Sequence, residues 1–221
     1  MQIDFERREV QLKVVYYGPA LSGKTTNLVS IHQMSAPSIR GRLMTLETRD
    51  DRTLFFDLLP MHFESDSGLS ITVKLFTVPG QVIHNATRKL VLQGADAVAF
   101  IADSQTSQIE ENQAAFLNLK DNLKENGLNL KSMPLVIQFN KRDLPGIRSD
   151  AEIESMAIRG REPVFKAIAT QGVGVLETLM GLMEITWERL DAWHNLEEKF
   201  GVQGKNLLES LARQLKPQET R

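Results

Sequence analysis

Residues 18–25 read Gly18-Pro19-Ala20-Leu21-Ser22-Gly23-Lys24-Thr25, and Thr26 follows directly. This order of glycine, four residues, glycine, lysine and a hydroxyl is typical of a loop that binds phosphates. Residues 10–17 alternate and are rich in β-branched side chains, which predicts a strand in front of the loop. Residues 24–33 contain neither proline nor glycine, which favours a helix behind it. Because the motif needs both neighbours, a chance match in a surface loop is the weaker interpretation.

The residue types of this loop have a chemical reason. Glycine lets the backbone curl so that successive N–H groups point at phosphate oxygens in front of a helix N-terminus. Lys24 would reach the β- and γ-phosphates, and the Thr25 hydroxyl would ligate Mg²⁺. We therefore predict a phosphate site made by Gly18, Pro19, Ala20, Leu21, Ser22, Gly23, Lys24, Thr25 and Thr26.

The rest of the chain alternates between expected strands and expected helices. Strands are expected at residues 43–46, 70–78, 95–103, 134–139 and 163–168, and helices at 82–93, 107–126, 149–158 and 173–190. This order predicts an α/β fold of three layers, with a mostly parallel central sheet and helices on both faces. We expect Arg88 and Lys89 to be exposed. We interpret the polar residues 47–53, which precede an apolar segment at 54–60, as a loop anchored beside the sheet or as a solvated turn.

Composition excludes several classes of function. The 221 residues have a formal net charge of −2, so there is no electrostatic reason to expect a nucleic-acid partner. Without cysteine the chain has no disulfide, thiolate metal site, prenyl anchor or palmitoyl anchor. The N-terminus is neither a myristoylation signal nor a signal peptide, and no apolar run reaches membrane-spanning length. These features predict a cytoplasmic protein with no integral membrane segment or lipid anchor.

The polar run Asn140-Lys141-Arg142-Asp143 closes the expected strand at 134–139. It fits the Asn/Thr-Lys-x-Asp pattern that reads guanine. The Asp143 carboxylate can accept hydrogen bonds from N1–H and the exocyclic amine of guanine, and adenine offers no such pair of donors. The Lys141 stem can lie along the purine, and Asn140 can tie this loop to the phosphate loop. Ala169 and Thr170 follow the next strand, where a backbone N–H can meet guanine O6, so we predict GTP/GDP and not ATP.

Together these motifs identify a family. The chain resembles Ras-like small GTPases, and within them the bacterial MglA group (mutual gliding protein A), over about residues 3–190. The stretches that carry the resemblance are residues 16–19, 21–27, 51–57 (Asp-Arg-Thr-Leu-Phe-Phe-Asp), 77–81 (Thr-Val-Pro-Gly-Gln) and 140–145 (Asn-Lys-Arg-Asp-Leu-Pro). It implies a Ras-like P-loop GTPase domain at residues 1–190, followed by a C-terminal helical extension at 191–221.

The resemblance also implies catalytic roles. Gln81, just after Gly80, would orient the attacking water, with Gly80 and Lys24 as further candidate catalytic residues. Arg52 looks like the arginine that this group supplies from its own first switch to neutralise charge in the transition state. The alternative for Arg52 is pairing with a neighbouring aspartate, and Arg49 is a weaker rival for the role.

The expected metal ligands follow from the same resemblance. Most Ras relatives carry aspartate at the position of Thr77, whereas threonine is usual in the MglA group, so Mg²⁺ would depend on Thr25, Thr53, phosphates and water. Thr53 would meet the metal and the γ-phosphate only in the GTP state and would be released on hydrolysis. The family is known to move the strand after the first switch, so we expect residues 43–63 to move.

The segment after residue 190 contains two amphipathic stretches. Leu190, Trp193, Leu196 and Phe200 have helical spacing, and we expect this stretch to pack on the domain. Leu207, Leu208, Leu211 and Leu215 form the second, for which packing on the domain and docking to a partner remain equal alternatives. From residue 191 onward acidic and basic residues balance, which disfavours a membrane-surface helix.

We therefore expect a GTP-dependent molecular switch with slow hydrolysis that resembles regulators of bacterial cell polarity and motility. The resemblance implies a Roadblock-domain (MglB-like) activating protein, polarity or motility effectors and recruitment to a cell pole. The alternatives are a GTP-bound scaffold with negligible hydrolysis and, more weakly, a kinase. Ala20 stands where relatives usually have glycine, and its methyl group would crowd the γ-phosphate and Gln81. We expect intact GTP binding, slow hydrolysis and a weak response to an activator. The alternative is that Arg52 and the moving switch tolerate the methyl group.

Overall fold

The computed structural model describes residues 1–48, 54–80 and 84–215, and it confirms the α/β architecture. The strands are β1 (Gln2–Asp4), β2 (Glu9–Tyr17), β3 (Met44–Thr48), β4 (Leu54–Glu64), β5 (Ser70–Thr77), β6 (Ala97–Asp103), β7 (Leu135–Asn140) and β8 (Val164–Lys166). The helices are α1 (Lys24–Met34), α2 (Asn85–Leu92), α3 (Ile109–Glu125), α4 (Asp150–Arg159), α5 (Val175–His194), α6 (Leu196–Phe200) and α7 (Gly204–Leu215). Short 3₁₀ helices are η2 (Thr106–Gln108), η3 (Leu130–Ser132) and η4 (Ala169–Gln171).

The strands form one mixed sheet in the order β3-β4-β5-β2-β6-β7-β8, with β1 paired to the start of β2. The pairs from β5 through β2, β6 and β7 to β8 are parallel. Parallel strands present their carboxyl ends at one edge, which is where ligands of such sheets bind. The predicted phosphate loop follows β2, and the predicted guanine motif follows β7, so both lie at this edge.

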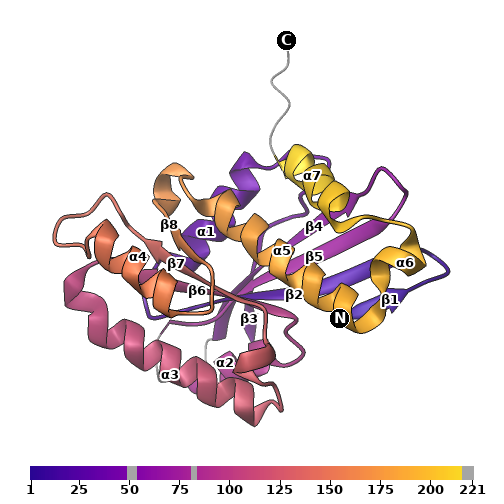
Figure 1. The fold of residues 1–221 in the computed structure, drawn as a ribbon. Helices are drawn as coiled ribbons and strands as arrows, with labels where there is room; N and C mark the ends of the chain where they lie inside the picture. Colours follow the sequence, from indigo (N-terminus) through magenta and orange to yellow (C-terminus); the bar gives the residue numbers. More distant parts are fainter. Residues whose placement is uncertain (49–53, 81–83, 216–221) are drawn as a thin grey trace.

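Helices cover both faces of the sheet, with α1, α5 and α7 on one side and α2, α3 and α4 on the other (Figure 1). The central strand β2 supplies both cores because successive side chains of a strand point to opposite faces. Val14 and Tyr16 belong to the core under α1 and α5, whereas Val15 and Tyr17 belong to the core under α2 and α3. The site is therefore carried by strands that are buried on both faces.

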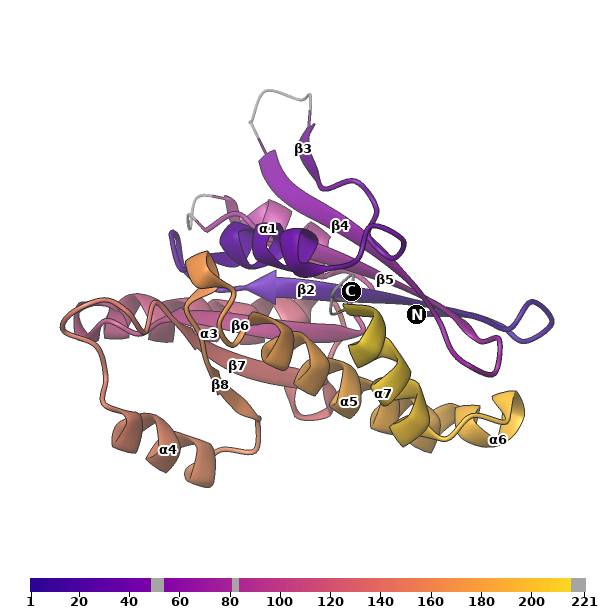
Figure 2. The same ribbon diagram turned by 90° about the horizontal axis from the view of Figure 1, so that it is seen from above.

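The polar run 47–53, which we interpret as an anchored loop or a solvated turn, lies outside the described residues except for Glu47 and Thr48, which end β3. No strand or helix was assigned to the apolar residues 54–60 from their pattern. These residues belong to β4, which runs antiparallel between β3 and β5 (Figure 2). Within this strand, Pro60 lacks a backbone donor, which argues against a central position in a sheet. The pairing of β3 with β4 ends at Leu58, so Pro60 lies beyond the stretch that has strands on both sides.

The extension after residue 190 packs on the sheet domain. Helix α5 continues to His194, and α7 contacts α5 and β4. Leu207, Leu211 and Leu215 are at most 2% exposed and join the core under α5. The first stretch is also packed, except that Trp193 is 66% exposed with the Arg189 guanidinium 4.1 Å from the centre of its ring. Of the two alternatives for the second stretch, the structure shows packing on the domain.

No helix within the described ranges has the length and apolar character that crossing a membrane requires.

Candidate functional site

A cavity of about 340 Å³ opens at the carboxyl edge of the sheet. Its walls come from the phosphate loop, from the start of α1, from β4 and from the end of β5. The lining residues are Leu21, Gly23, Lys24, Thr25, Thr26, Asp57, Thr77, Val78, Pro79 and Gly80. The structure thus brings the predicted phosphate loop together with the segment that precedes Gln81.

The two glycines of the phosphate loop are required by the backbone. Gly18 and Gly23 have φ values of 149° and 97°, which side chains rarely allow. A Cβ on Gly18 would lie 2.2 Å from the Ile101 carbonyl oxygen, and one on Gly23 would lie 2.2 Å from Asn140 Nδ2. The loop therefore packs directly on β6 and on the residue that begins the guanine motif, leaving its other side open as a cradle.

Lys24 is 6% exposed and donates hydrogen bonds to the carbonyls of Gly18 (3.1 Å) and Pro19 (2.6 Å). Burial, reinforced by the positive charge of Arg88, lowers the pKa of Lys24 to about 7, although Asp57 acts in the opposite direction. A buried ammonium without a counter-charge of matching strength is suited to an anionic ligand. The phosphates of a nucleotide are such a ligand.

Asp57 is a residue of this site that the sequence analysis missed. Its carboxylate accepts hydrogen bonds from the hydroxyls of Thr25 (2.6 Å), Thr77 (2.9 Å) and Thr45 (2.9 Å), and the side chain is 7% exposed. The register of β4 against β5 places Asp57 beside Thr77, the position where most Ras relatives carry aspartate. A carboxylate therefore reaches this part of the cavity from the neighbouring strand. The available signal was a single acid at a buried position of an apolar run.

Asn140 connects the two predicted motifs. Its Nδ2 donates to the Ser22 carbonyl (2.8 Å), and its Oδ1 accepts from the Ala169 N–H (2.9 Å), all in a buried setting. The side chain amide thus joins the phosphate loop to the loop after β8. Lys141, in the left-handed region with φ 65°, pairs with Asp103 at 2.7 Å. Asp103 ends β6 and was not among the predicted site residues.

The remaining guanine-reading residues lie at the same edge. Asp143 is exposed in the turn that follows β7. The Ala169 N–H donates to Asn140 Oδ1. Thr170 follows it, exposed, in η4. A backbone donor to guanine O6 from this pair stays a prediction.

The expectation that Arg88 is exposed is wrong. Arg88 is 1% exposed, and its guanidinium donates to the carbonyls of Pro79 and Gly80 at the rim of the cavity. The error arose because helix α2 was assigned an outward basic face, whereas this face packs against α3. Lys89 is more exposed than Arg88, with 44% of its side chain accessible beside Glu125.

Three predicted residues, Gln81, Arg52 and Thr53, lie outside the described residues. Gly80 is described, and it touches the phosphate loop. A Cβ on Gly80 would lie 2.4 Å from Ala20 Cα and 3.1 Å from Ala20 Cβ. The two segments are therefore in contact, with Ala20 on one side of the contact and Gly80 on the other.

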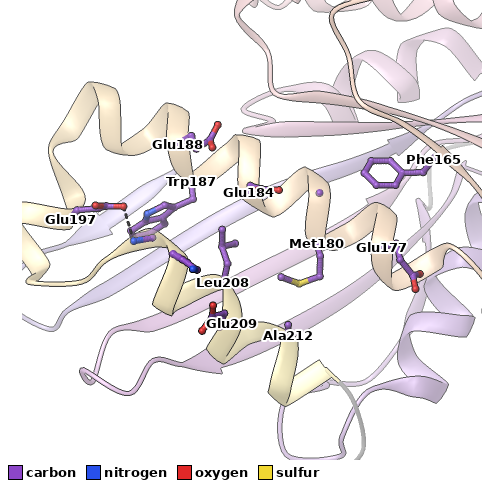
Figure 3. Close-up of a pocket in the computed structure, with 13 residues that line it drawn as sticks. Phe165, Glu177, Met180, Glu184, Trp187, Glu188, Glu197, Leu208, Glu209 and Ala212 are labelled. Atoms are coloured by element: carbon purple, nitrogen blue, oxygen red, sulfur yellow. Dashed lines mark hydrogen bonds between the residues drawn. The ribbon is translucent and has the colours of Figure 1, made fainter. Parts of the chain in front are cut away.

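Among the described residues, two larger cavities lie away from this edge of the sheet. One, of about 730 Å³, lies between α5 and the helices of the extension, where Met180, Trp187 and Leu208 form its apolar part (Figure 3). Glutamates surround it, among them Glu184 and Glu188 (Figure 3). The other, of about 620 Å³, is an apolar groove between α3 and α4. Neither contains a residue of the predicted motifs, so the smaller cavity is the candidate site.

Comparison with known proteins places this geometry in context. No protein-family model matches the chain. The chain is 44% identical over 188 residues to "Mutual gliding-motility protein MglA" of Myxococcus xanthus (strain DK1622). The aligned region covers 85% of this chain and 96% of that protein.

Proposed function

Since the chain belongs to the MglA family of Ras-like small GTPases, we propose that it is a GTP-binding molecular switch that hydrolyses GTP slowly and regulates cell polarity or motility. The proposal is carried by one observation: Asn140 holds the phosphate loop and the loop after β8 together through two buried hydrogen bonds. This contact brings a phosphate cradle and a candidate purine-reading carboxylate, Asp143, to the same edge of the sheet. A guanine nucleotide is a ligand with groups for both.

The residues fit the phosphate part of such a ligand. Leu21 and Gly23 of the loop line the cavity together with Lys24, whose ammonium donates to the Gly18 and Pro19 carbonyls. When GTP or GDP is bound, Lys24 would exchange the carbonyls of Gly18 and Pro19 for phosphate oxygens. At the other end, Asp143 would accept from the guanine edge, and a backbone N–H of Ala169 or Thr170 would donate to O6.

The residues also fit Mg²⁺, which prefers hard oxygen ligands and keeps several waters. Thr25 and Asp57 would hold it, directly or through water, because their oxygens are 2.6 Å apart and both line the cavity. The described residues contain no cluster of three or more His, Cys, Asp or Glu that could hold a metal alone. The nucleotide phosphates would complete the ligand set, with Thr53 as the further ligand that the family implies. The metal supplies positive charge to the phosphates.

For hydrolysis we propose Gln81 as the residue that orients water and Arg52 as the residue that neutralises transition-state charge. Gly80 would present its N–H to the terminal phosphate from the rim of the cavity. The contact between Gly80 and Ala20 supports slow hydrolysis, because the Ala20 methyl group occupies space where these groups must approach the phosphate.

The same contact favours a second candidate function, a GTP-bound scaffold with negligible hydrolysis that acts only through nucleotide-dependent binding of partners. A Roadblock-domain activator, polarity or motility effectors and a cytoplasmic location with recruitment to a cell pole belong to the proposed switch.

The two functions differ in one measurement, single-turnover GTP hydrolysis with and without a Roadblock-domain partner. A switch releases phosphate at a rate that falls in Gln81→Ala and Arg52→Ala and rises in Ala20→Gly. Near-zero rates in the wild type and in all three variants support the scaffold. Identification of the co-purifying nucleotide tests both, because ATP in place of GTP or GDP contradicts the guanine assignment.

A further inference from the structure

Among the described residues, Arg88 has one of the largest fully buried side chains, although its guanidinium is permanently charged. It lies on α2 and reaches away from solvent toward the end of β5. Burying a guanidinium is unfavourable unless its donors find acceptors and its charge finds a counter-charge. Over residues 1–48, 54–80 and 84–215, no carboxylate lies within ion-pair distance of Arg88.

The acceptors that Arg88 does find belong to the backbone in front of Gln81. Nε donates to the Pro79 carbonyl (2.8 Å), and Nη2 donates to the Gly80 carbonyl. Nη1 donates to Asn118 Oδ1 (2.8 Å) on α3. One guanidinium therefore joins the segment after β5 to the middle of α3.

Asn118, the α3 residue that contacts Arg88, is itself held by further hydrogen bonds. The Tyr17 hydroxyl donates to Asn118 Oδ1 (2.5 Å), and Asn118 Nδ2 donates to Asn85 Oδ1 (2.9 Å). Asn122 Nδ2 lies within hydrogen-bond distance of both Tyr17 and Asn85. The Arg88 guanidinium also lies 5.7 Å from the centre of the Tyr17 ring. These contacts lock the orientation of Arg88 to β2 and α3, which are rigid elements.

The consequence for the site follows from peptide geometry. The bond between Pro79 and Gly80 is planar and trans, so its carbonyl and the Gly80 N–H point in opposite directions. By holding the Pro79 carbonyl, Arg88 sets the direction of the Gly80 N–H. Gly80 lines the cavity together with Lys24 and Thr25, and its α-carbon side faces Ala20.

We propose that Arg88 is a positioning residue for the terminal phosphate of GTP. It holds the Pro79–Gly80 peptide so that the Gly80 N–H faces the phosphate loop, and its uncompensated charge adds positive potential at the end of the site. This inference rests on the proposed function and goes further by assigning discrimination between GTP and GDP to a residue outside the cavity. The lowered pKa of Lys24, to which Arg88 contributes, is consistent with that charge reaching the site.

The test compares Arg88→Gln and Arg88→Lys with the wild type, and uses Lys89→Gln as the matched control because Lys89 is the adjacent, exposed cation of α2. The first readout is the ratio of the dissociation constants for a non-hydrolysable GTP analogue and for GDP, both with Mg²⁺. Only the analogue has the terminal phosphate, so we expect Arg88→Gln to weaken it about 10- to 100-fold while GDP changes by about 3-fold or less. Arg88→Lys should recover part of the loss, since it restores the charge but not the three-way geometry.

The second readout needs no nucleotide. Amide hydrogen exchange of Thr77, Val78 and Gly80 in the nucleotide-free protein should become faster in Arg88→Gln and remain unchanged in Lys89→Gln. Equal weakening of both nucleotides, or exchange that stays at the wild-type rate, would overturn the positioning role.

The outcomes separate this inference from the proposed function. If the wild type binds both nucleotides but does not hydrolyse GTP, the proposed switch function is wrong. The ratio of the dissociation constants for the GTP analogue and for GDP still tests the role of Arg88. If the wild type prefers ATP, the guanine assignment fails, and hydrogen exchange still shows whether Arg88 holds Pro79 and Gly80. Should Arg88→Gln not fold, Arg88→Lys is measured by the same two readouts.

Discussion

Replacement of Asp57 by asparagine should weaken the coupling between Mg²⁺ and nucleotide without removing the nucleotide site. The Asp57 carboxylate accepts three hydroxyl hydrogen bonds, of which the one from Thr25 is the shortest at 2.6 Å. Asparagine keeps the shape of the side chain and removes its charge. If the carboxylate ligates the metal or holds Thr25 for it, its loss should raise the Mg²⁺ concentration that half-maximally slows nucleotide dissociation by about 10- to 100-fold. This corresponds to a loss of about 1.4–2.7 kcal/mol in the free energy of Mg²⁺ binding.

Without Mg²⁺, the same substitution should not weaken nucleotide binding. Asp57 is an anion beside the site of the phosphates, so its neutralisation should leave GDP binding in EDTA unchanged or slightly tighter. Protein stability should fall by about 1–3 kcal/mol, because charge-assisted hydrogen bonds to threonine hydroxyls become neutral ones. The variant should therefore fold and remain measurable.

The assay is dissociation of a fluorescent GDP analogue across a Mg²⁺ titration, with denaturant unfolding measured in parallel. Asp121→Asn serves as the control because it makes the same chemical change at an exposed position of α3. A folded Asp57→Asn protein whose Mg²⁺ midpoint moves by less than about 3-fold would refute the reasoning, because a ligand or its direct support must change the midpoint more. A fall in GDP affinity in EDTA would also refute it.

Three further predictions concern the connection between the motifs, the extension and the lysine. Asn140→Ala should lower the free energy of unfolding by about 2–4 kcal/mol, because Ser22 and Ala169 each lose a buried partner, and GDP affinity should fall with it; calorimetry measures both. Leu211→Ala in α7 should lower the free energy of unfolding by about 2–5 kcal/mol in a denaturant titration, and an equal loss in the half-buried Leu208→Ala would contradict the role of burial. The pKa of Lys24 is about 7 in the folded, nucleotide-free protein and 10.5 in its ordinary state. Between pH 7 and pH 10.5 the unfolded chain therefore binds a proton that the folded protein does not, so the free energy of unfolding without nucleotide should rise with pH across this range. Phosphates that restore the charge should make GDP binding take up protons above pH 7, which calorimetry in buffers of different ionisation enthalpy detects and which should vanish in Lys24→Arg.

The elements that the sequence predicted well are those with strong local patterns. The all-buried strand β6 and the capped helix α4 lie within two residues of their expected bounds. Ser149 and Glu152 form a capping box at the start of α4, in which side chains satisfy free backbone N–H groups. The pattern of residues 54–64 predicted no strand because a proline within it argues against one. Strand β1 was missed because three residues are too few to show a period.

The residues of the candidate site also differ in whether local sequence patterns predict them. The phosphate loop could be predicted because glycine at 18 and 23 is required by local backbone dihedral angles and by the close approach of β6 and Asn140. The residues that we expect to bind phosphate form one continuous stretch, so no knowledge of distant contacts was needed for this prediction.

Asp57 and Arg88 could not be predicted in this way. Asp57 reaches the cavity only because the register of β4 against β5 brings it beside Thr77. Arg88 reaches the Pro79 and Gly80 carbonyls at the rim only because α2 packs on α3. Which strands and helices pair over such sequence distances depends on how the apolar side chains on the two faces of the sheet are buried together. The sequence by itself therefore determined the fold class and the phosphate and guanine motifs, because these depend on local spacing and backbone conformation. The tertiary structure alone decided which buried charges stand around the site, because that depends on which elements lie next to one another in space.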